Sequence, residues 1–496
     1  MTLDPKWVPM KWPCGPLEIA RRSKSGSINA DVKDVLESWS HPSALELLKG
    51  TPVNCLIVEW ASGGPEDSAQ QQGLRPLLEA GRRLGISFVA RVRVAEGTEA
   101  AVADARAAGV AAVMLGPGSG RSFDLPVILQ YPHDKVAWET TSSIFAATEN
   151  DWPGVKLETM NGDTAEAGPT GIPWVNSNDW FSLLAGTLAP GRTLWLDSEP
   201  PGSSTLAHPA NYELAVADSR ANGSQWIISL DDKLRAALTQ GNAPARDIWK
   251  RLCEAVEFFD RHRAWDQFKP QGVLAVTSDF AGENSSLSEE VLNLLSRREI
   301  QFRISPRSRP LPAFGQGVKA ILWLDPEAPG AEQHSQLLAF VRQGGLLIAS
   351  AYWGPQEVKP MQKDPSLDYK MYDIGKGQIA VAEEAFQDPY QVAQEAHLLV
   401  SRRSDLVRLY NPNATSCHLS IDPGAGRRLV QVLNYSAQPA DSLTLWVNAR
   451  VGPGTLWRLG AKDAVAVRDV AAERGTYFDL PSLSVYGALE CGGSSL

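Results

Sequence analysis

The stretch NCLIVEWASGGPEDSAQQQGLRPLLEAGRRLGISFVARVRV, residues 54–94, decides the fold class. Residues 54–60 and 86–94 are short, apolar and rich in β-branched side chains, which is typical of strands buried on both faces. Between them, residues 74–84 place leucines at helical spacing. A strand, a helix and a second strand in this order predict two parallel strands joined by a right-handed crossover.

The same alternation continues on both sides of this stretch. We predict strands at 8–12, 54–60, 86–94, 110–115, 126–130, 154–158, 192–197 and 225–230, and helices at 29–48, 74–84, 98–109, 138–148, 174–188, 209–223 and 244–262. Eight strands separated by helices in roughly 250 residues match a (β/α)8 TIM barrel. A doubly wound open sheet is the rival fold, but its usual glycine-rich phosphate turn after the first strand is missing here.

Two further domains are expected after a barrel that spans residues 1–267. Residues 268–403 alternate strand and helix patterns again, which predicts a small open α/β domain. Residues 404–496 form short apolar runs separated by Gly, Pro and Asn turns, which predict an antiparallel β-sandwich.

The composition excludes several classes of function. Hydrophobic residues make up 43% and charged residues 21% of the chain, as in ordinary folded proteins. A formal net charge of -10 argues against nucleic acid or an anionic membrane surface as a partner. No apolar run approaches the ~20 residues of a membrane span. Residues 1–12 show no signal-peptide pattern, and the compartment stays open.

Metal and cofactor chemistry leaves no motif in the sequence. The five cysteines are widely scattered, lack any C-x-x-C pair and are predicted to be buried free thiols; they are Cys14, Cys55, Cys253, Cys417 and Cys491. There is no H-E-x-x-H zinc motif, no G-x-S-x-G elbow and no P-loop. We therefore expect neither a metal nor a cofactor.

Acidic residues gather where a barrel places its chemistry, at the C-terminal ends of the strands. Residues 192–202, RTLWLDSEPPG, run from a buried strand into Asp197 and Glu199, and two prolines then stiffen the loop. Glu158 and Asp231 end the predicted strands on either side of Asp197. Since these three strands are neighbours, their carboxylates are expected to lie close together.

Two facing carboxylates are the groups that hydrolyse glycosidic bonds, one as acid and the other as nucleophile or base. The predicted catalytic residues are Glu158, Asp197 and Glu199. Indole and phenol rings stack on sugars, and amides and carboxylates bind hydroxyl groups. The predicted substrate-binding residues are Glu59, Trp60, Tyr131, Trp138, Asn176, Asn178, Trp195 and Asp231.

Several of these residues have structural alternatives. Asp231 is also placed to cap the helix that follows it. Glu59 could form an ion pair with Arg91. Asn176 and Asn178 could simply begin a helix, and Asp197 could form a turn before the prolines.

The order of barrel, small α/β domain and β-sandwich resembles the family 42 β-galactosidases and related multi-domain barrel glycoside hydrolases. Their middle domain resembles a class I glutamine amidotransferase and mediates trimer contacts. Residues 321–350 are similar to its strand–helix–Gly-Gly–strand pattern, and residues 374–381 to its late hairpin. The resemblance implies a glycosidase that acts on a carbohydrate and forms a homo-oligomer, either a dimer or a trimer.

The chain departs from this family after the fourth strand. Family 42 enzymes carry an Asn-Glu pair there, whose Glu is the acid/base, whereas this chain has GPGSG at 116–120. The acid role then falls to Glu158 or Glu59. The nucleophilic cysteine of an amidotransferase is also missing, since the nearest cysteines, Cys253 and Cys417, lie outside the middle domain.

Two other functions are compatible with the sequence. One is a non-catalytic carbohydrate-binding or assembly protein built on a degenerate barrel, which the missing fourth-strand acid favours. The other is a lyase or isomerase that acts on a sugar acid, with Arg91 or Arg93 binding the carboxylate.

Overall fold

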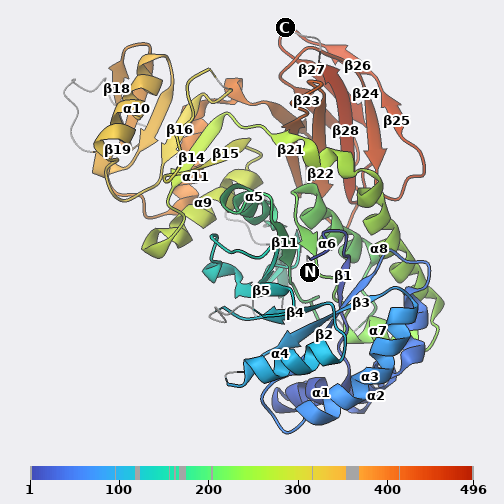
Figure 1. Ribbon diagram of the computed structural model, residues 1–496. Helices are drawn as coiled ribbons and strands as arrows, with labels where there is room; N and C mark the ends of the chain where they lie inside the picture. Colours follow the sequence, from blue (N-terminus) through green and yellow to red (C-terminus); the bar gives the residue numbers. More distant parts are fainter. Residues whose placement is uncertain are drawn as a thin grey trace. The chain divides into compact units, whose positions relative to one another are not determined.

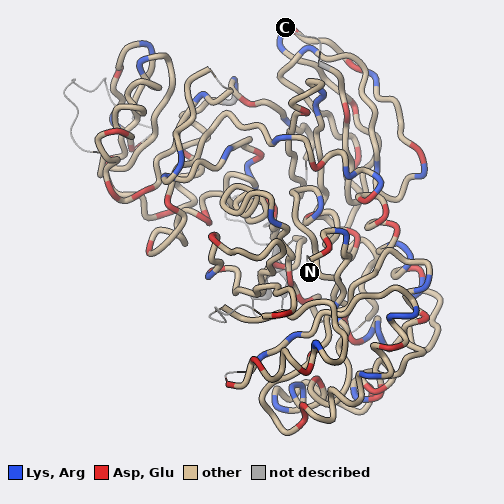
Figure 2. Tube along the Cα trace, in the orientation of Figure 1, with Lys and Arg blue, Asp and Glu red and all other residues tan. Residues whose placement is uncertain are grey.

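The chain forms two compact units, each described here by itself. The computed structural model describes residues 3–94, 96–117, 123–155, 157–160, 163–166, 175–202, 205–315, 317–353, 368–412 and 414–493, with the backbone path alone at 157–160 and 163–166. The first unit comprises Met1–Pro153 and Ala189–Arg261, and the second comprises Gly154–Leu188 and His262–Leu496. Charged residues of both signs are distributed along the chain in both units (Figure 2).

The first unit is an eight-stranded parallel barrel (Figure 1). Its strands, in spatial order, are β1 (Pro9–Lys11), β2 (Cys55–Ala61), β3 (Ser87–Val92), β4 (Ala112–Leu115), β5 (Val127–Pro132), β6 (Ile144–Thr148), β11 (Thr193–Leu196) and β12 (Gln225–Trp226). Lys11 N donates to Ile228 O over 2.8 Å, and Ile228 N donates to Pro9 O over 2.9 Å. These bonds join the first strand to the end of the last, so the sheet is almost completely closed and the predicted TIM barrel is confirmed.

Helices cover the barrel between most strands. They are α1 (Gly15–Lys24), α2 (Ala30–Ser40), α3 (Asp67–Arg83), α4 (Thr98–Ala107), α6 (Pro209–Ala221), α7 (Asp232–Thr239) and α8 (Ala243–Arg261), with 3-10 turns η1 (Pro42–Leu48) and η2 (His133–Lys135). Side-chain caps fix where some of them begin. Asn29 Oδ1, for example, accepts from Val32 N over 2.9 Å at the start of α2.

The sixth barrel strand is β6, not residues 154–158, and the predicted helix at 138–148 is wrong. Thr140, Thr141 and Ser142 are poor helix formers. The connection between β5 and β6 therefore holds only the turn η2. The strand expected at 154–158 falls instead in two short antiparallel pairs of the second unit. These are β7 (Gly154–Val155) with β10 (Val175–Asn176), and β8 (Leu157–Met160) with β9 (Asp163–Glu166).

Alternate side chains along the barrel strands pack together in a shared apolar cluster. The cluster contains Trp7, Cys55, Ile57, Val89, Ala112, Met114, Ile128, Ile144, Ala146, Trp195 and Ile227. The rings of Trp7 and Trp195 lie 6.4 Å apart and tilted. Because the side chains of a strand alternate between its two faces, this cluster identifies the inward-facing phase of every strand.

The second unit contains a six-stranded sheet with one antiparallel edge strand. In spatial order its strands are β15 (Phe302–Pro306), β14 (Leu274–Ser278), β16 (Ala320–Trp323), β17 (Leu346–Ala349), β19 (Gly377–Ala382) and β18 (Tyr369–Ile374). The helices of this unit are α5 (Asp179–Leu188), α9 (Ser285–Arg297), α10 (Ala331–Arg342) and α11 (Pro389–Val400), and its 3-10 turns are η3 (Arg263–Gln267), η4 (Gly282–Asn284), η5 (Ala351–Trp353) and η6 (Arg402–Ser404). This is the open α/β arrangement expected from the sequence.

Two antiparallel sheets complete the second unit and pack on one apolar core. The first contains β13 (Lys269–Pro270), β21 (Thr415–Ile421), β22 (Arg428–Asn434), β28 (Tyr486–Gly493), β24 (Val451–Arg458) and β25 (Val465–Val467). The second contains β20 (Val407–Tyr410), β23 (Leu443–Val447), β27 (Thr476–Leu480) and β26 (Asp469–Ala471). Leu419 and Val430 of the first sheet share a buried cluster with Leu445 and Phe478 of the second, which confirms the β-sandwich.

A buried carboxylate ties three parts of the second unit together. Asp179, at the start of α5, accepts a hydrogen bond from Ser177 Oγ over 2.8 Å and another from Ser296 Oγ of α9. His418 Nε2 of β21 lies 3.1 Å from its Oδ2. Burial alone would raise the pKa of Asp179, but His418 and the two serines hold it below its usual value. Helix α5 is therefore bound to the second unit, although it lies between two barrel strands in the sequence.

All five cysteines are buried free thiols, as expected. Within the part of the chain that the structure describes, no helix is both long and apolar enough to cross a membrane.

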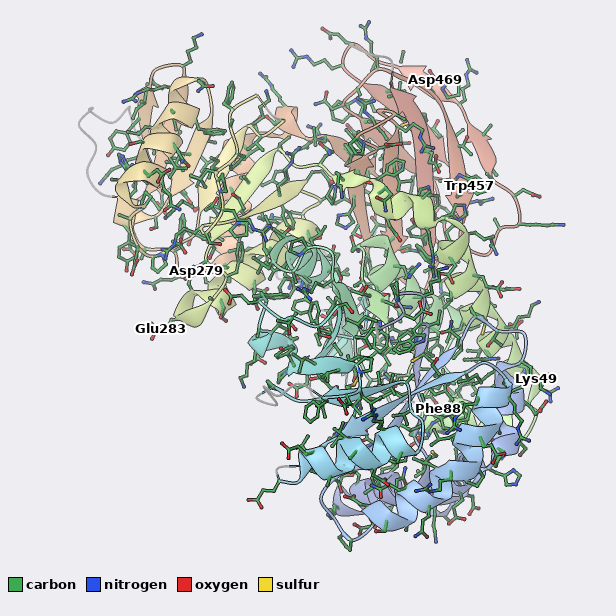
Figure 3. The ribbon with its side chains drawn as sticks, in the orientation of Figure 1. Lys49, Phe88, Asp279, Glu283, Trp457 and Asp469 are labelled. Atoms are coloured by element: carbon green, nitrogen blue, oxygen red, sulfur yellow. The ribbon has the colours of Figure 1, made fainter. Side chains whose placement is uncertain are left out.

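Helix α3 depends on a glycine where it meets strand β3. A Cβ at Gly81 would lie 2.3 Å from Cε2 of Phe88, which Figure 3 labels. Gly73, on the same helix, is exposed, and a Cβ there would meet no atom within 4 Å.

We expect Gly81→Ala to lower the free energy of unfolding by about 1–3 kcal/mol, because the added methyl group overpacks the contact with Phe88. Gly73→Ala should raise it by about 0.5–1 kcal/mol, since alanine is the better helix former. Urea unfolding followed by tryptophan fluorescence measures both variants against the wild type. A Gly81→Ala protein as stable as the wild type would contradict the contact.

Candidate active site

A layer of mostly polar residues lies above the apolar barrel core. Each of its members stands two positions beyond an inward-facing residue, or four positions in the case of Lys11, at the C-terminal end of its strand, and so points the same way. The layer consists of Lys11, Glu59, Arg91, Gly116, Gln130, Thr148, Asp197 and Ser229. The barrel therefore gathers both signs of charge at its C-terminal mouth, where barrel enzymes carry their chemistry.

Asp197 is the centre of a buried ion-pair network. Its Oδ1 contacts Lys11 Nζ, and its Oδ2 lies 3.0 Å from Arg91 Nη2. Gln130 Nε2 donates to the same Oδ2 over 3.3 Å. Asp197 and Arg91 are both about 5% exposed, so these contacts replace water as their partners.

The network keeps its buried charges ionised. Burial would raise the pKa of Asp197, but the coulombic effect of Lys11 and Arg91 lowers it below its usual value. Burial would lower the pKa of Arg91, but Glu59 and Asp197 raise it above its usual value. Both oxygens of Asp197 are engaged, so this buried carboxylate holds Lys11 and Arg91 in place.

Glu59 and Glu199 extend the network outward. Glu59 Oε1 lies 3.3 Å from Arg91 Nη1 and 3.1 Å from Arg93 Nη2, so the predicted ion pair with Arg91 is confirmed. Glu199 Oε1 contacts Lys11 Nζ, and its Oε2 accepts a hydrogen bond from Ser229 Oγ over 3.1 Å. With 75% of its side chain exposed, Glu199 is the network's most accessible carboxylate.

Two cavities open at this mouth. The larger has a volume of about 910 Å³ and is lined by residues that include Gln130, Tyr131, Glu149, Asn150, Asp197 and Glu199. The smaller has a volume of about 100 Å³. The two share Lys11, Arg21, Arg91, Arg93 and Glu199 as lining residues.

Glu149 is a site residue that sequence reasoning missed. It directly follows β6, it is exposed, and it lines the larger cavity. Its φ of 64° is in the left-handed region, which non-glycine residues rarely adopt and which recurs at active sites. Within the described part of the chain its carboxylate has no ion-pair partner. Assigning residues 138–148 to a helix hid this strand end and its neighbours Thr148 and Asn150.

Lys11 was also missed. The position of β1 was predicted. Lys11 follows the core residue Trp7 by four positions, so its side chain lies on the same face of the strand. Counting this phase from the core residue would have placed Lys11 at the mouth.

Several predicted substrate-binding residues lie away from the cavities. Trp60 and Trp195 are completely buried and offer no face to a sugar, so their predicted stacking role is wrong. Trp60 follows the inward-facing Glu59 and takes the opposite side of the strand, whereas Trp195 lies one layer below Asp197. Trp138 is half-buried, edge-on to Phe145 with ring centroids 6.5 Å apart.

Asp231 has a structural role. Its Oδ1 accepts from Leu234 N over 2.8 Å and caps α7, and Tyr212 Oη donates to its Oδ2 over 2.5 Å. The capping alternative is therefore confirmed, because the carboxylate is used to begin a helix.

Three predicted residues belong to the second unit. Asn176 pairs with Gly154 in the β7–β10 ladder, and Asn178 is buried just before α5. Glu158 lies in β8, but its side chain is outside the described residues. The expectation that Glu158 ends a barrel strand beside Asp197 is wrong, because β6 occupies that place.

No metal-binding group is found among the described residues: no three His, Cys, Asp or Glu side chains are placed to hold an ion together.

Comparison with solved structures supports the architecture. The chain is similar to alpha-L-fucosidase isoenzyme 2 from Paenibacillus thiaminolyticus, with a TM-score of 0.57 and 10% identity. The superposition covers 99% of this chain and 100% of the fucosidase chain. A GH42 beta-galactosidase from G. stearothermophilus has a TM-score of 0.35 and 9% identity over 86% of this chain and 67% of its own. The exo-beta-1,4-mannosidase Op5Man5 from Opitutaceae bacterium strain TAV5 has a TM-score of 0.35 and 13% identity over 77% and 94%.

Of these three structures, the fucosidase has a TM-score above 0.5, and at 10% identity it supports the fold alone. The expected resemblance to multi-domain barrel glycoside hydrolases is thus confirmed at the level of architecture. No model of a known protein family and no curated protein matches the chain.

Replacing Asp197 tests the network. We expect Asp197→Asn to lower the free energy of unfolding at pH 7 by about 3–5 kcal/mol, because it leaves Lys11 and Arg91 buried without their anion. Since the pKa of Asp197 is lowered in the folded state, its stabilisation is present above the unfolded value of about 3.9. It is lost as pH falls through the folded pKa.

The difference between wild type and Asp197→Asn should therefore stay constant from pH 7 to about pH 5 and shrink below about pH 4. Urea unfolding at a series of pH values measures it. Glu199→Gln is the control, because an exposed ion pair contributes only about 0–1 kcal/mol. Equal losses in the two variants would show that burial of Asp197 does not control stability.

Proposed function

We propose that the chain is a glycoside hydrolase that binds a carbohydrate in the larger cavity at the barrel mouth. One observation supports this most directly. Two exposed carboxylates, Glu149 after β6 and Glu199 after β11, line the same cavity of about 910 Å³. Ligand sites for small molecules usually have about 300–1,000 Å³, which is enough for one or two sugar rings.

The two carboxylates differ in their surroundings. Glu199 is held on both oxygens, by Lys11 and by Ser229, which fixes its orientation toward the cavity. We assign it as the nucleophile, or as the base that activates water. Among the residues that the structure describes, none makes such a contact with Glu149, which we assign as the acid that protonates the leaving oxygen. That proton leaves on the departing alcohol. In a retaining reaction Glu149 regains a proton from the water that hydrolyses the glycosyl-enzyme; in an inverting reaction Glu199 takes the water's proton, and exchange with solvent restores both residues.

Asp197 acts through Lys11 in this scheme and is a positioning residue. It fixes the amine that contacts Glu199, and it remains ionised because Arg91 and Gln130 also bind it. Tyr131 lines the same cavity and offers a ring face or a hydroxyl group to a sugar. Glu158 remains a prediction, since its side chain lies outside the described residues.

Glu199→Gln and Glu149→Gln should each reduce kcat/KM on activated aryl glycosides by about 10²–10⁴-fold, the range typical of a lost acid–base or nucleophilic group. Glu79→Gln, an exposed substitution on α3, is the matched control and should retain wild-type activity. A panel of 4-nitrophenyl glycosides of both anomers provides the measurement. Full activity in both mouth variants would exclude these two residues as the catalytic pair.

A non-catalytic carbohydrate-binding protein is the second candidate. The engagement of both Asp197 oxygens and the absence of an acid in GPGSG after β4 favour it. Calorimetric titration with the same glycosides separates the two functions. Binding without any release of 4-nitrophenol would favour the second candidate, whereas turnover would exclude it.

The middle sheet and the oligomeric state add further proposals. The sheet β15-β14-β16-β17-β19-β18, with its late antiparallel hairpin, supports the likeness to a glutamine amidotransferase domain.

By analogy with family 42 we expect a homodimer or homotrimer. Light scattering at micromolar concentration measures the mass, and a strictly monomeric protein would exclude self-association.

A further inference from the structure

The smaller cavity at the barrel mouth is unusually cationic. Six of its lining side chains carry a positive charge and three carry a negative charge, a surplus of three. The cations are Lys11, Arg21, Arg22, Arg91, Arg93 and Arg235. The acids are Glu18, Glu59 and Glu199. Counting Asp197 and Asp232, which pair with several of these cations, still leaves one positive charge without a counterpart.

Two guanidinium groups in this cavity have donors that nothing in the described part of the chain accepts. They are the Nε–H groups of Arg91 and Arg235, both buried. Leaving a buried donor unpaired costs free energy, and the cost is greater when the group is charged. The structure bears this cost twice within one cavity.

Arg235 is the more extreme of the two. It is 1% exposed, its Nη2 contacts Asp232, and its Nη1 lies 3.4 Å from Pro13 O. Its guanidinium carbon stands 5.6 Å from the ring centroid of Trp39. Burial holds the pKa of Arg235 below its usual value, so the surroundings supply less negative charge than the guanidinium needs.

We infer that the carbohydrate bound at this mouth is acidic, with a compact anionic substituent seated in the smaller cavity while its ring occupies the larger one. This inference rests on the proposed function. The two cavities share five lining residues, so one ligand can occupy both. The smaller volume of about 100 Å³ equals roughly three water molecules, about the size of a carboxylate.

A carboxylate, as in a uronic acid, matches this cavity best. Arginine presents a planar fork of donors that binds a planar carboxylate with two parallel hydrogen bonds. Arg93 is half-exposed, and its one contact in the described part of the chain is with Glu59. It is therefore available to the ligand at the rim, while the buried Arg91 and Arg235 add positive charge to the wall of the cavity. A sulfate ester shares the charge but is tetrahedral.

The test uses matched ligand pairs on the full-length protein. Methyl glucuronide and methyl glucoside differ only at C6, and methyl galacturonide and methyl galactoside form a second pair. Both anomers are included, and 6-O-sulfated glycosides provide the sulfate arm. Calorimetric titration at 50 mM and 500 mM NaCl measures affinity. The 4-nitrophenyl versions of the same sugars report hydrolysis separately.

We expect the acidic member of at least one pair to bind 10-fold or more tightly than its neutral counterpart at 50 mM NaCl. The preference should fall at high salt, because screening weakens exposed charge contacts. Arg93→Gln should remove most of it. Arg106→Gln removes an exposed barrel charge that lines neither cavity, and should leave the preference intact.

Each outcome decides one question. Equal affinity for acidic and neutral partners overturns the inference, and hydrolysis of the neutral glycosides would leave the proposed function standing. Acid-selective binding without any hydrolysis supports the inference and overturns the hydrolase. Tighter binding of the 6-O-sulfated glycosides than of the uronides would support an anionic site but overturn the assignment of a uronic acid as its ligand. A preference that survives in Arg93→Gln overturns the assignment of this cavity.

Discussion

The burial of Asp197 with Lys11 and Arg91 controls what the barrel mouth can do. Three charges removed from water are stable only while they face one another. Because the partners come from β1, β3 and β11, the network joins strands far apart around the ring. The network also occupies both oxygens of Asp197, the carboxylate that the sequence analysis predicted to be catalytic. The proposed function therefore assigns the reaction to the acids that reach solvent, Glu149 and Glu199.

Much of the fold and part of the site could be derived from the sequence by periodicity. Short apolar runs separated by helical patterns identified seven of the eight barrel strands, because strands buried on both faces have few polar positions. The exception was β6, whose five residues follow a run of Thr and Ser and were read as part of a helix. A short apolar run cannot be distinguished from a buried helix segment by periodicity alone, and nothing in the flanking residues marked this one as a strand.

The site residues show where such reasoning stops. Alternation along a strand separates Glu59 from Trp60, and applying it would have removed Trp60 from the list of sugar-binding residues. It also places Lys11, Arg91 and Asp197 on the inner face. It does not show that these residues neutralise one another, since that depends on strands that meet only when the ring closes. The role of Asp231 as a helix cap was visible locally, in the residues that follow it.

The position of α5 has a practical consequence for dividing the protein. Residues 154–188 interrupt the barrel in the chain but fold with the second unit, where Asp179 finds Ser296 and His418. A truncated protein that stops soon after α8 would retain this excursion but lose both of its anchors. Asp179 would then lose the partners that compensate its burial. To obtain a soluble isolated barrel, residues 154–188 should be deleted and Pro153 joined to Ala189 by a short linker.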